Sequence, residues 1–249
     1  MAGLTFQDFK KLVETYEQRM PVLAVKVKDH KFSMCTPNLK CLGFAATANE
    51  REPATNAWIY GFRPGEIFFD VGANNGLYGL IAAVVSGCEV HAFEPHFASY
   101  YVTTRNIYLN KLENRMFCYP IAVSDQDGAG KLFLSSVTAG KSLNNYGNAR
   151  PSDDPIWNAM IPQGAVSMSL DSFIEKTGIV PHHVKIDVDG LEPQIIRGAA
   201  RLLQNPKLQS MMVEAMESIP EHAAIHDIML AAGFSRFIKD AAGNFYFRD

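Results

Sequence analysis

Hydrophobic and polar positions alternate along most of the chain in a way that predicts strands followed by helices. An apolar run, Ile67 to Phe69, predicts a buried strand, and apolar residues at 77–84 then recur at helical spacing. The same alternation continues to the end of the chain, so the expected fold class is a doubly wound α/β sheet. We expect strands at 89–93, 115–122, 131–135, 165–168, 183–188 and 209–215, helices at 96–109, 171–176, 193–203 and 219–231, and a terminal hairpin with an antiparallel edge strand at 234–239 and 244–247.

Residues 1–60 precede this pattern and predict a separate α+β extension. Apolar residues at helical spacing, with Thr5 as a possible N-cap, predict a first helix that Pro21 ends. We expect this extension to pack over the open end of the sheet as a lid or to mediate homodimer contacts, while residues 61–249 form the main domain. Its expected elements are helices at 4–20, 39–48 and 53–60 and a strand pair at 22–27 and 31–35.

Composition narrows the class of protein. The chain has 249 residues, a hydrophobic fraction of 47% and a net charge of −3, which suits one α/β domain with an addition. The slight acidity argues against binding to long nucleic acids, which requires clustered lysine and arginine. No apolar run is long enough to span a membrane, and the four cysteines form no C-x-x-C pair. We therefore expect a soluble cytoplasmic protein with reduced cysteines.

The turn after the first main strand, from Asp70 to Gly76, indicates a nucleotide-like ligand, because its glycines let the backbone approach closely. No lysine of a phosphate-binding loop follows, and the third glycine of the dinucleotide fingerprint is absent. Glu94, about 20 residues past the turn, is placed to accept both hydroxyls of a ribose. Asp70 adds negative charge that a phosphate would avoid, so S-adenosylmethionine fits best. Alternatively, Asp70 and Glu94 are only a helix cap and a surface acid.

Four segments, in order, strengthen this reading: DVGANNGLYGL from Asp70, FEP at Glu94, AVSD from Ala122 and KIDVDGLEPQIIRGA from Lys185. Together they resemble the FkbM-type family of S-adenosylmethionine-dependent methyltransferases over about residues 60–240. The resemblance implies a Rossmann-like class I methyltransferase sheet and O-methylation of sugars or polyketides. It implies a cofactor site formed by Asp70, Gly72, Ala73, Asn74, Gly76, Tyr78, Glu94, Pro95, Ala122, Val123, Ser124, Ser142 and Asp187, with Ser124 or Asp125 near the adenine amino group and Asn144 in a loop beside Ser142.

Methyl transfer to oxygen requires an aligned acceptor hydroxyl and a group that removes its proton. Lys185, Asp187 and Asp189 alternate, so they point to one side if the strand continues to Asp189. Asp187 is the first candidate for the general base, followed by Asp189 and Glu192, although Lys185 and Asp187 could form a structural ion pair. Glu192 could instead cap the next helix. Glu214, which ends an apolar strand, is a second catalytic or sugar-binding candidate, or a surface acid.

Other chemistries are weaker. Asp187 and Asp189 could hold Mg²⁺ through oxygens, but we do not favour a metal. His222 and His226 lie four residues apart without an H-E-x-x-H motif. The motif [DN]-P-P-[YF] of N-methyltransferases is absent, which favours a hydroxyl acceptor, either a sugar of a polysaccharide or glycolipid or a secondary metabolite. The competing functions are an NAD-dependent oxidoreductase, which lacks its Y-x-x-x-K motif here, and a non-catalytic cofactor-binding relative.

Overall fold

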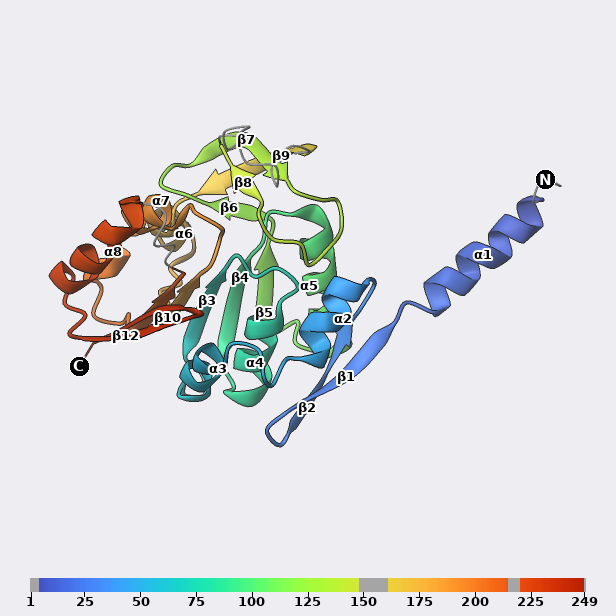
Figure 1. Ribbon diagram of the computed structural model, residues 1–249, viewed down its shortest axis with the longest axis horizontal. Helices are drawn as coiled ribbons and strands as arrows, with labels where there is room; N and C mark the ends of the chain where they lie inside the picture. Colours follow the sequence, from blue (N-terminus) through green and yellow to red (C-terminus); the bar gives the residue numbers. More distant parts are fainter. Residues whose placement is uncertain (1–4, 148–160, 215–219, 249) are drawn as a thin grey trace.

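A seven-stranded, mostly parallel sheet forms the centre of the molecule in the computed structural model, which describes residues 5–147, 161–214 and 220–248 (Figure 1). The parallel strands are β3 (Ile67–Val71), β4 (Glu89–Phe93), β5 (Met116–Tyr119), β10 (His183–Ile186) and β11 (Ser210–Val213). The hairpin of β12 (Arg236–Asp240) and β13 (Gly243–Phe247) completes the order β12-β13-β11-β10-β3-β4-β5, with β13 antiparallel to β11. The doubly wound sheet and its antiparallel edge confirm the predicted fold class.

Helices cover both faces of this sheet, and each face has its own apolar core. Successive residues of a strand point to opposite faces, so Phe68 packs with one cluster and Phe69 with the other. The first face carries α3 (Pro53–Tyr60), α4 (Leu77–Val85) and α5 (Phe97–Leu109), and the second carries α6 (Leu170–Thr177), α7 (Glu192–Arg197) and α8 (Pro220–Ala231). No helix in the described ranges combines the length and apolar character needed to cross a bilayer.

A second sheet lies above the carboxyl ends of the parallel strands (Figure 1). Its order is β6-β9-β7-β8, formed by β6 (Ile121–Val123), β7 (Gly128–Leu134), β8 (Asn145–Tyr146) and β9 (Ile161–Met168). The single strand predicted at 115–122 is therefore wrong. Pro120 has no N–H to donate to a ladder, and the chain leaves β4 there and pairs with β9 instead. The break brings Ile121 to Val123 over the end of the main sheet.

The N-terminal extension forms the elements that the pattern predicts. They are α1 (Phe6–Gln18), β1 (Val22–Val27), β2 (His30–Cys35), α2 (Leu39–Ala46) and α3, and Thr5 caps α1 in a capping box with Asp8. The β1–β2 hairpin is attached to α5: the N–H groups of Ser33 and Cys35 donate to the side chains of Asn110 and Asn106, both at 2.7 Å. Asn110 also ends α5, as expected.

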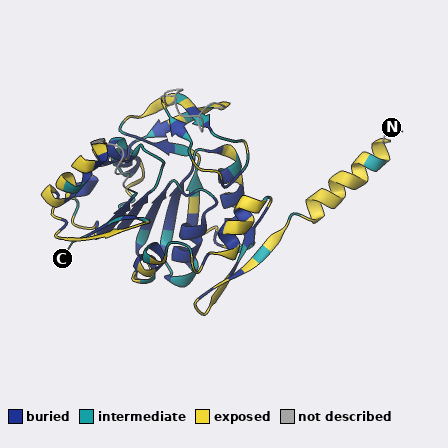
Figure 2. Ribbon diagram, viewed as in Figure 1, coloured by how far each residue is buried: buried dark blue, intermediate teal, exposed yellow. Residues whose placement is uncertain are grey.

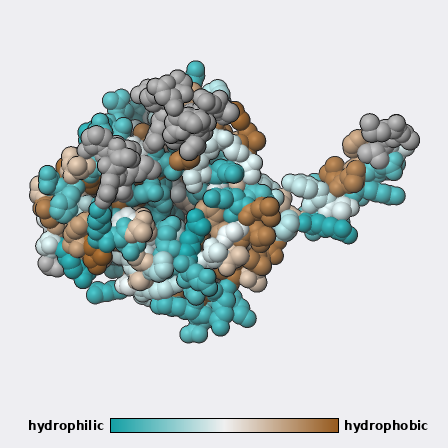
Figure 3. All heavy atoms as spheres, in the orientation of Figure 1, coloured by the Kyte–Doolittle hydropathy of each residue, from teal (hydrophilic) through white to brown (hydrophobic). Residues whose placement is uncertain are grey.

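Helix α1 behaves differently from the rest of the extension. It projects away from the body of the molecule, and none of its residues is buried (Figures 1 and 2). Its apolar side chains face solvent, as the brown region on the projecting segment shows (Figure 3). Residues 22–62, in contrast, share a core with the main sheet, including Val27, Met34 and Ile59.

The helix predicted at 193–203 is interrupted. It ends at Arg197, and Gly198 follows where a side chain would overlap the backbone oxygen of Ser124. A short 3₁₀ turn, η2 (Leu202–Gln204), comes next, and Asp171 accepts from the N–H groups of Arg201 (2.8 Å) and Leu202 (2.9 Å). The break lets α7 pack closely against the end of β6.

Candidate active site

The turn after β3 connects three strand tips. The N–H groups of Gly72 and Ala73 donate to the carbonyl of Phe93, at 3.0 and 3.1 Å. Gly72 has a φ of +79°, and a Cβ there would overlap the backbone oxygen of Asp187. Only glycine therefore lets β3 and β10 approach at this point. The turn forms the floor of a pocket at the carboxyl ends of β3, β4 and β10, where α/β sheets bind ligands.

Asp70 lies beneath this turn and not on the pocket wall. Its side chain is completely buried, and Oδ2 accepts from the N–H of Gly79 (3.1 Å) in the first turn of α4. Burial raises the pKa of Asp70 to about 6, although the nearby Lys185 ammonium opposes this shift. The geometry matches the helix-cap alternative for Asp70. Gly76 also lies outside the pocket lining, at the left-handed N-cap of α4.

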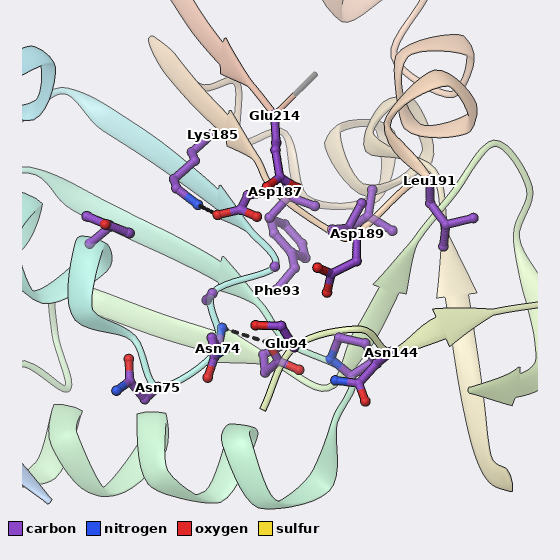
Figure 4. A pocket seen from close by; sticks show the side chains of 18 of the residues that line it. Asn74, Asn75, Phe93, Glu94, Asn144, Lys185, Asp187, Asp189, Leu191 and Glu214 are labelled. Atoms are coloured by element: carbon purple, nitrogen blue, oxygen red, sulfur yellow. Dashed lines mark hydrogen bonds and ion pairs between the residues drawn. The ribbon is translucent and has the colours of Figure 1, made fainter. Parts of the chain in front are cut away.

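Glu94 lies on the pocket wall just past β4 and is held by two backbone groups. Its Oε2 accepts from the N–H of Asn74 (2.7 Å) and its Oε1 from the N–H of His96 (2.8 Å) (Figure 4). The residue is only 6% exposed, so it is not a surface acid. Burial raises its pKa to about 8 despite these two donors. Each oxygen retains a lone pair for a ligand.

Apolar side chains line the part of the pocket beside Glu94. They come from the end of β4 and from the second sheet, and the break at Pro120 is what brings them together. Ala122 and Val123 are among them, as expected for an adenine site, together with Phe93, Pro95, Ile121, Leu132 and Tyr146. Ser124 is not on the pocket wall: its Oγ donates to Asp125 (3.3 Å), which pairs with Arg197 (3.1 Å). This geometry agrees with a structural role for Asp125 in the turn after β6.

The opposite part of the pocket carries Lys185 and Asp187 (Figure 4). Lys185 is 1% exposed, and its Nζ lies 2.5 Å from Oδ2 of Asp187. The same ammonium lies over the ring of Tyr78, 5.0 Å from its centroid. Burial by itself lowers the pKa of Lys185, but the carboxylates of Asp187 and Asp70 outweigh it and raise the pKa. The predicted ion pair is therefore present, with Asp187 facing the pocket.

Asp187 and Asp189 both line the pocket, but the strand geometry expected for them is wrong. Strand β10 ends at Ile186, and Asp189 lies in a turn with a φ of +60°. The side chain of Asp189 points to the loop at 139–144, where its Oδ2 accepts from the N–H of Leu143 (2.6 Å). Ser142 and Asn144 of this loop line the pocket, as the family resemblance implied.

The two remaining acids have different environments. Glu192 is completely buried outside the pocket, where its Oε1 accepts from the N–H of Val188 (3.0 Å) and its Oε2 lies 3.3 Å from Nε2 of His222. It stabilises the start of α7 and does not face a ligand. Glu214 lines the pocket, and burial, with the charges of Asp187, Glu192 and Asp189, raises its pKa to about 8.

Comparison with known proteins identifies the family. Residues 70–236 match the sequence family described as the Methyltransferase FkbM domain. The chain belongs to the FkbM methyltransferase family. This confirms the family resemblance seen in the four sequence segments. No curated protein matches the chain.

Solved structures agree on the fold. The methyltransferase FkbM from Methylobacillus flagellatus KT has a TM-score of 0.50 and 16% identity, over 75% of this chain and 44% of that one. The chain thus spans less than half the length of that protein. Two further structures have lower scores. A precorrin-6Y C5,15-methyltransferase from Geobacter metallireducens GS-15 has a TM-score of 0.46 and 9% identity, over 81% of this chain and 89% of that one. M. jannaschii TYW2 in complex with AdoMet has a TM-score of 0.42 and 14% identity, over 90% of this chain and 82% of that one. The match to the methyltransferase FkbM structure, at a TM-score of 0.50, supports the predicted class I methyltransferase fold.

Part of the pocket comes from outside the matched FkbM segment. Phe44, Arg51 and Glu52, between β2 and α3, line the pocket, and sequence reasoning did not assign them. Glu52 has a φ of +44°, a left-handed conformation that is uncommon for a residue with a side chain. Neither spacing nor a motif connects these positions with the turn at Gly72. Asn75 and Lys141 are further lining residues that were not predicted.

Metal-ligating residues do not gather in the described part of the FkbM protein. Across residues 5–147, 161–214 and 220–248, no three His, Cys, Asp or Glu side chains form a group suited to a metal ion. His222 contacts Glu192, and the ring of His226 packs on Phe237 with centroids 4.7 Å apart. These contacts give the histidine pair a structural role in the packing of α8.

Proposed function

We propose that this FkbM protein is an S-adenosylmethionine-dependent O-methyltransferase acting on a hydroxyl group of a small acceptor. The acceptor class that fits the family is a sugar of a polysaccharide or glycolipid, or a secondary metabolite. The observation that carries the proposal is Glu94, a buried carboxyl fixed by two backbone donors at the junction of β3 and β4. A ribose diol needs two such acceptor oxygens in a dry, rigid position.

The rest of the pocket fits the same nucleoside. The apolar wall from Phe93 to Val123 suits an adenine ring, and Asn74 Oδ1 and Asn75 Nδ2 are buried polar atoms that lack a partner in the described structure. The pocket is rich in carboxyl groups, which suits a positively charged sulfonium and disfavours a pyrophosphate. When bound, the cofactor would supply an electrophilic methyl group.

Among the acids that line the pocket, Asp187 is the best candidate for the general base. Its carboxylate faces the pocket beside the Lys185 ammonium, and about a third of its side chain remains exposed. Glu214, with a pKa of about 8, is mostly protonated at pH 7 and is better suited to donate a hydrogen bond to the acceptor. Asp189 is already engaged by the N–H of Leu143.

Calorimetric titration tests the cofactor. We expect micromolar binding of S-adenosylhomocysteine and none of NADH, and the reverse result would favour an oxidoreductase. Glu94→Ala should weaken S-adenosylhomocysteine binding by about 1–3 kcal/mol, the usual loss for a buried hydrogen-bonding partner. Asp187→Asn should leave this binding unchanged and suppress transfer of a labelled methyl group to candidate glycans. If turnover survives in Asp187→Asn, the base lies elsewhere.

For the N-terminal extension we propose both expected roles, divided between its parts. The segment at 44–52 closes one side of the pocket and serves as the lid. Helix α1 pairs with a second copy of the chain, because its exposed apolar residues follow the three-four spacing of helix pairs. It carries three acids and only two bases, so it lacks the positive charge of a helix that binds an anionic membrane. The seam residues are Phe6, Phe9, Val13 and Tyr16.

Light scattering tests this pairing. The unmodified chain should have the mass of a dimer, and Phe9→Glu or Val13→Glu should reduce it to a monomer while S-adenosylhomocysteine binding is retained. Lys11→Glu, on the polar side of α1, should leave the dimer intact. A monomeric unmodified chain would exclude the pairing.

A further inference from the structure

Arg51 is a cation on the wall of the pocket. In the described part of the chain, it forms no ion pair and its Nε has no hydrogen-bond partner. The guanidinium is stacked on the ring of Phe44, 3.9 Å from the centroid to Cζ. Stacking fixes the plane of a guanidinium while leaving N–H groups at its edge for a planar anion.

The backbone around Arg51 is also fixed. The side chain of Asn56, which is 2% exposed, donates to the carbonyl groups of Arg51 and Ala48, both at 3.0 Å. The N–H of Arg51 donates to the carbonyl of Thr47 (2.7 Å), and the left-handed Glu52 with Pro53 starts α3 directly afterwards. Arg51 is therefore positioned at the pocket by a rigid corner between α2 and α3.

The other charged residues of the pocket indicate which kind of ligand group Arg51 could bind. Glu52, Glu94, Asp187, Asp189 and Glu214 face the pocket, with only three cations among its lining residues. Lys185 is buried and paired with Asp187, and Lys141 is an exposed side chain on the loop at 139–144. A ligand carboxylate in this acidic environment requires a positive partner, and Arg51 is the one that is both fixed and available.

We propose that Arg51 binds the carboxylate of the methionine part of the cofactor. The inference rests on the proposed function, because it assigns one more contact to the same cofactor. The adenosine end lies at Glu94 and the apolar wall, so the amino-acid end extends toward Tyr78, Lys185 and Arg51. Its ammonium group and the sulfonium face the acids, and its carboxylate accepts from the guanidinium. The N-terminal extension thereby takes part in cofactor recognition.

Two related ligands separate this contact from the rest of the site. S-adenosylhomocysteine has the carboxylate, whereas 5′-methylthioadenosine has the same adenosine and sulfur but no amino-acid end. Calorimetry on the full chain should show that Arg51→Gln weakens S-adenosylhomocysteine binding about 10- to 100-fold, as for a hydrogen bond to a charged group. Binding of 5′-methylthioadenosine should stay within about twofold. Arg51→Lys should retain part of the affinity, because it keeps the charge without the planar fork.

Arg105 provides a matched control. Its guanidinium also packs on an aromatic ring, that of Tyr101, at 5.8 Å, but it lies outside the pocket lining. Arg105→Gln should leave both affinities unchanged. The inference is overturned if Arg51→Gln weakens both ligands equally, if it weakens neither, or if Lys141→Met produces the selective loss instead. If the unmodified chain binds neither ligand, the proposed function fails together with this inference.

Discussion

Buried carboxyl groups around the pocket hold protons at unusually high pH. Burial raises the pKa of Asp70 to about 6 and those of Glu94 and Glu214 to about 8, compared with ordinary values near 4. These groups have different surroundings: Asp70 lies near Lys185, whereas Glu94 and Glu214 line the pocket, at the proposed nucleoside and acceptor ends. Protonation of these carboxyl groups should therefore affect ligand binding in the pocket near neutral pH.

The pKa of Glu94 predicts a pH-dependent affinity. At pH 7 the carboxyl is mostly protonated, and it loses its proton as the pH rises through 8. The ionised form accepts hydrogen bonds from ribose hydroxyls better, so S-adenosylhomocysteine affinity should rise about tenfold between pH 7 and pH 9 and then level off. Calorimetry at several pH values measures this. Glu94→Gln should flatten the profile, and an equal rise in that variant would assign the effect to another group.

Lys185 predicts a large effect on stability. Lys185→Met removes the cation that faces the buried Asp70 and Asp187, so the free energy of unfolding at pH 7 should fall by about 3–5 kcal/mol. The loss should be smaller near pH 5, where Asp70 can be protonated. Urea denaturation at pH 7 and at pH 5 measures the two losses. The double variant Lys185→Met, Asp70→Asn should regain part of the stability lost in Lys185→Met. An unchanged midpoint in Lys185→Met would show that the ion pair is not needed for folding.

The sequence is sufficient to locate residues whose position depends on local spacing. Glu94 and Asp187 follow strands at the distances that the fold requires, so both were placed at the pocket. Asp70 was expected to face the ligand, but its position one residue before the end of β3 turns it inward. Arg51 could not be found, because stacking on Phe44 and contact with the pocket arise only after distant segments pack together.

At the scale of elements, the contact between the tips of β3 and β10 is the most constrained feature. Gly72 provides it, since its backbone is left-handed and a Cβ would overlap Asp187. Asp187 in turn donates its N–H to the carbonyl of Val71 (3.1 Å). Separating the two tips would move the base candidate away from the turn at which we propose that the cofactor binds.

Gly72→Ala should therefore be more harmful than an alanine at another left-handed glycine. Gly65, in the turn before β3, has a φ of +84° and open space around it, so Gly65→Ala should cost only the backbone strain of about 1–2 kcal/mol. Gly72→Ala adds overpacking and should cost about 2–5 kcal/mol in total. It should also abolish S-adenosylhomocysteine binding. Denaturation and calorimetry on both variants measure this, and equal losses would contradict it.

Most elements were predictable because their periodicity is strong and their turns contain glycine or proline. The predicted elements are wrong where tertiary contacts determine the end of a strand or helix. The strand at 115–122 splits at Pro120 because β9 offers a second partner, and the helix after Glu192 stops at Gly198 because Ser124 lies against it. Such contacts involve residues far apart in sequence, which periodicity does not reveal.

For the molecule as a whole, the folding unit is larger than the segment that matches the family. The match begins at residue 70, yet Val27, Met34 and Ile59 share a core with Phe68. The sequence pattern predicts a boundary between the extension and the doubly wound sheet at residue 60. It could not show how closely residues 22–62 pack on that sheet, because the extension's short elements carry no signal for their partner.

Truncated chains test this boundary. A chain beginning at Met20 lacks only α1, which has no buried residue, and should keep its S-adenosylhomocysteine affinity within about twofold. A chain beginning at residue 61 loses a large part of the core and should show no cooperative unfolding transition. Circular dichroism during heating distinguishes the two. Cooperative unfolding of the shorter chain would make the extension an independent addition.

Trp58 offers an optical consequence of this packing. Its indole N–H donates to Oγ of Ser210 (2.8 Å), and its ring contacts Phe62 and Phe68. Trp58 itself does not line the proposed cofactor pocket. The chain contains two tryptophans, so Trp157→Phe leaves Trp58 as the sole emitter at long wavelength. The emission of buried Trp58 should be blue-shifted and should move to longer wavelength when α3 detaches from the sheet. It should not change when a nucleoside binds in the pocket. Trp58 fluorescence would therefore report folding independently of ligand binding.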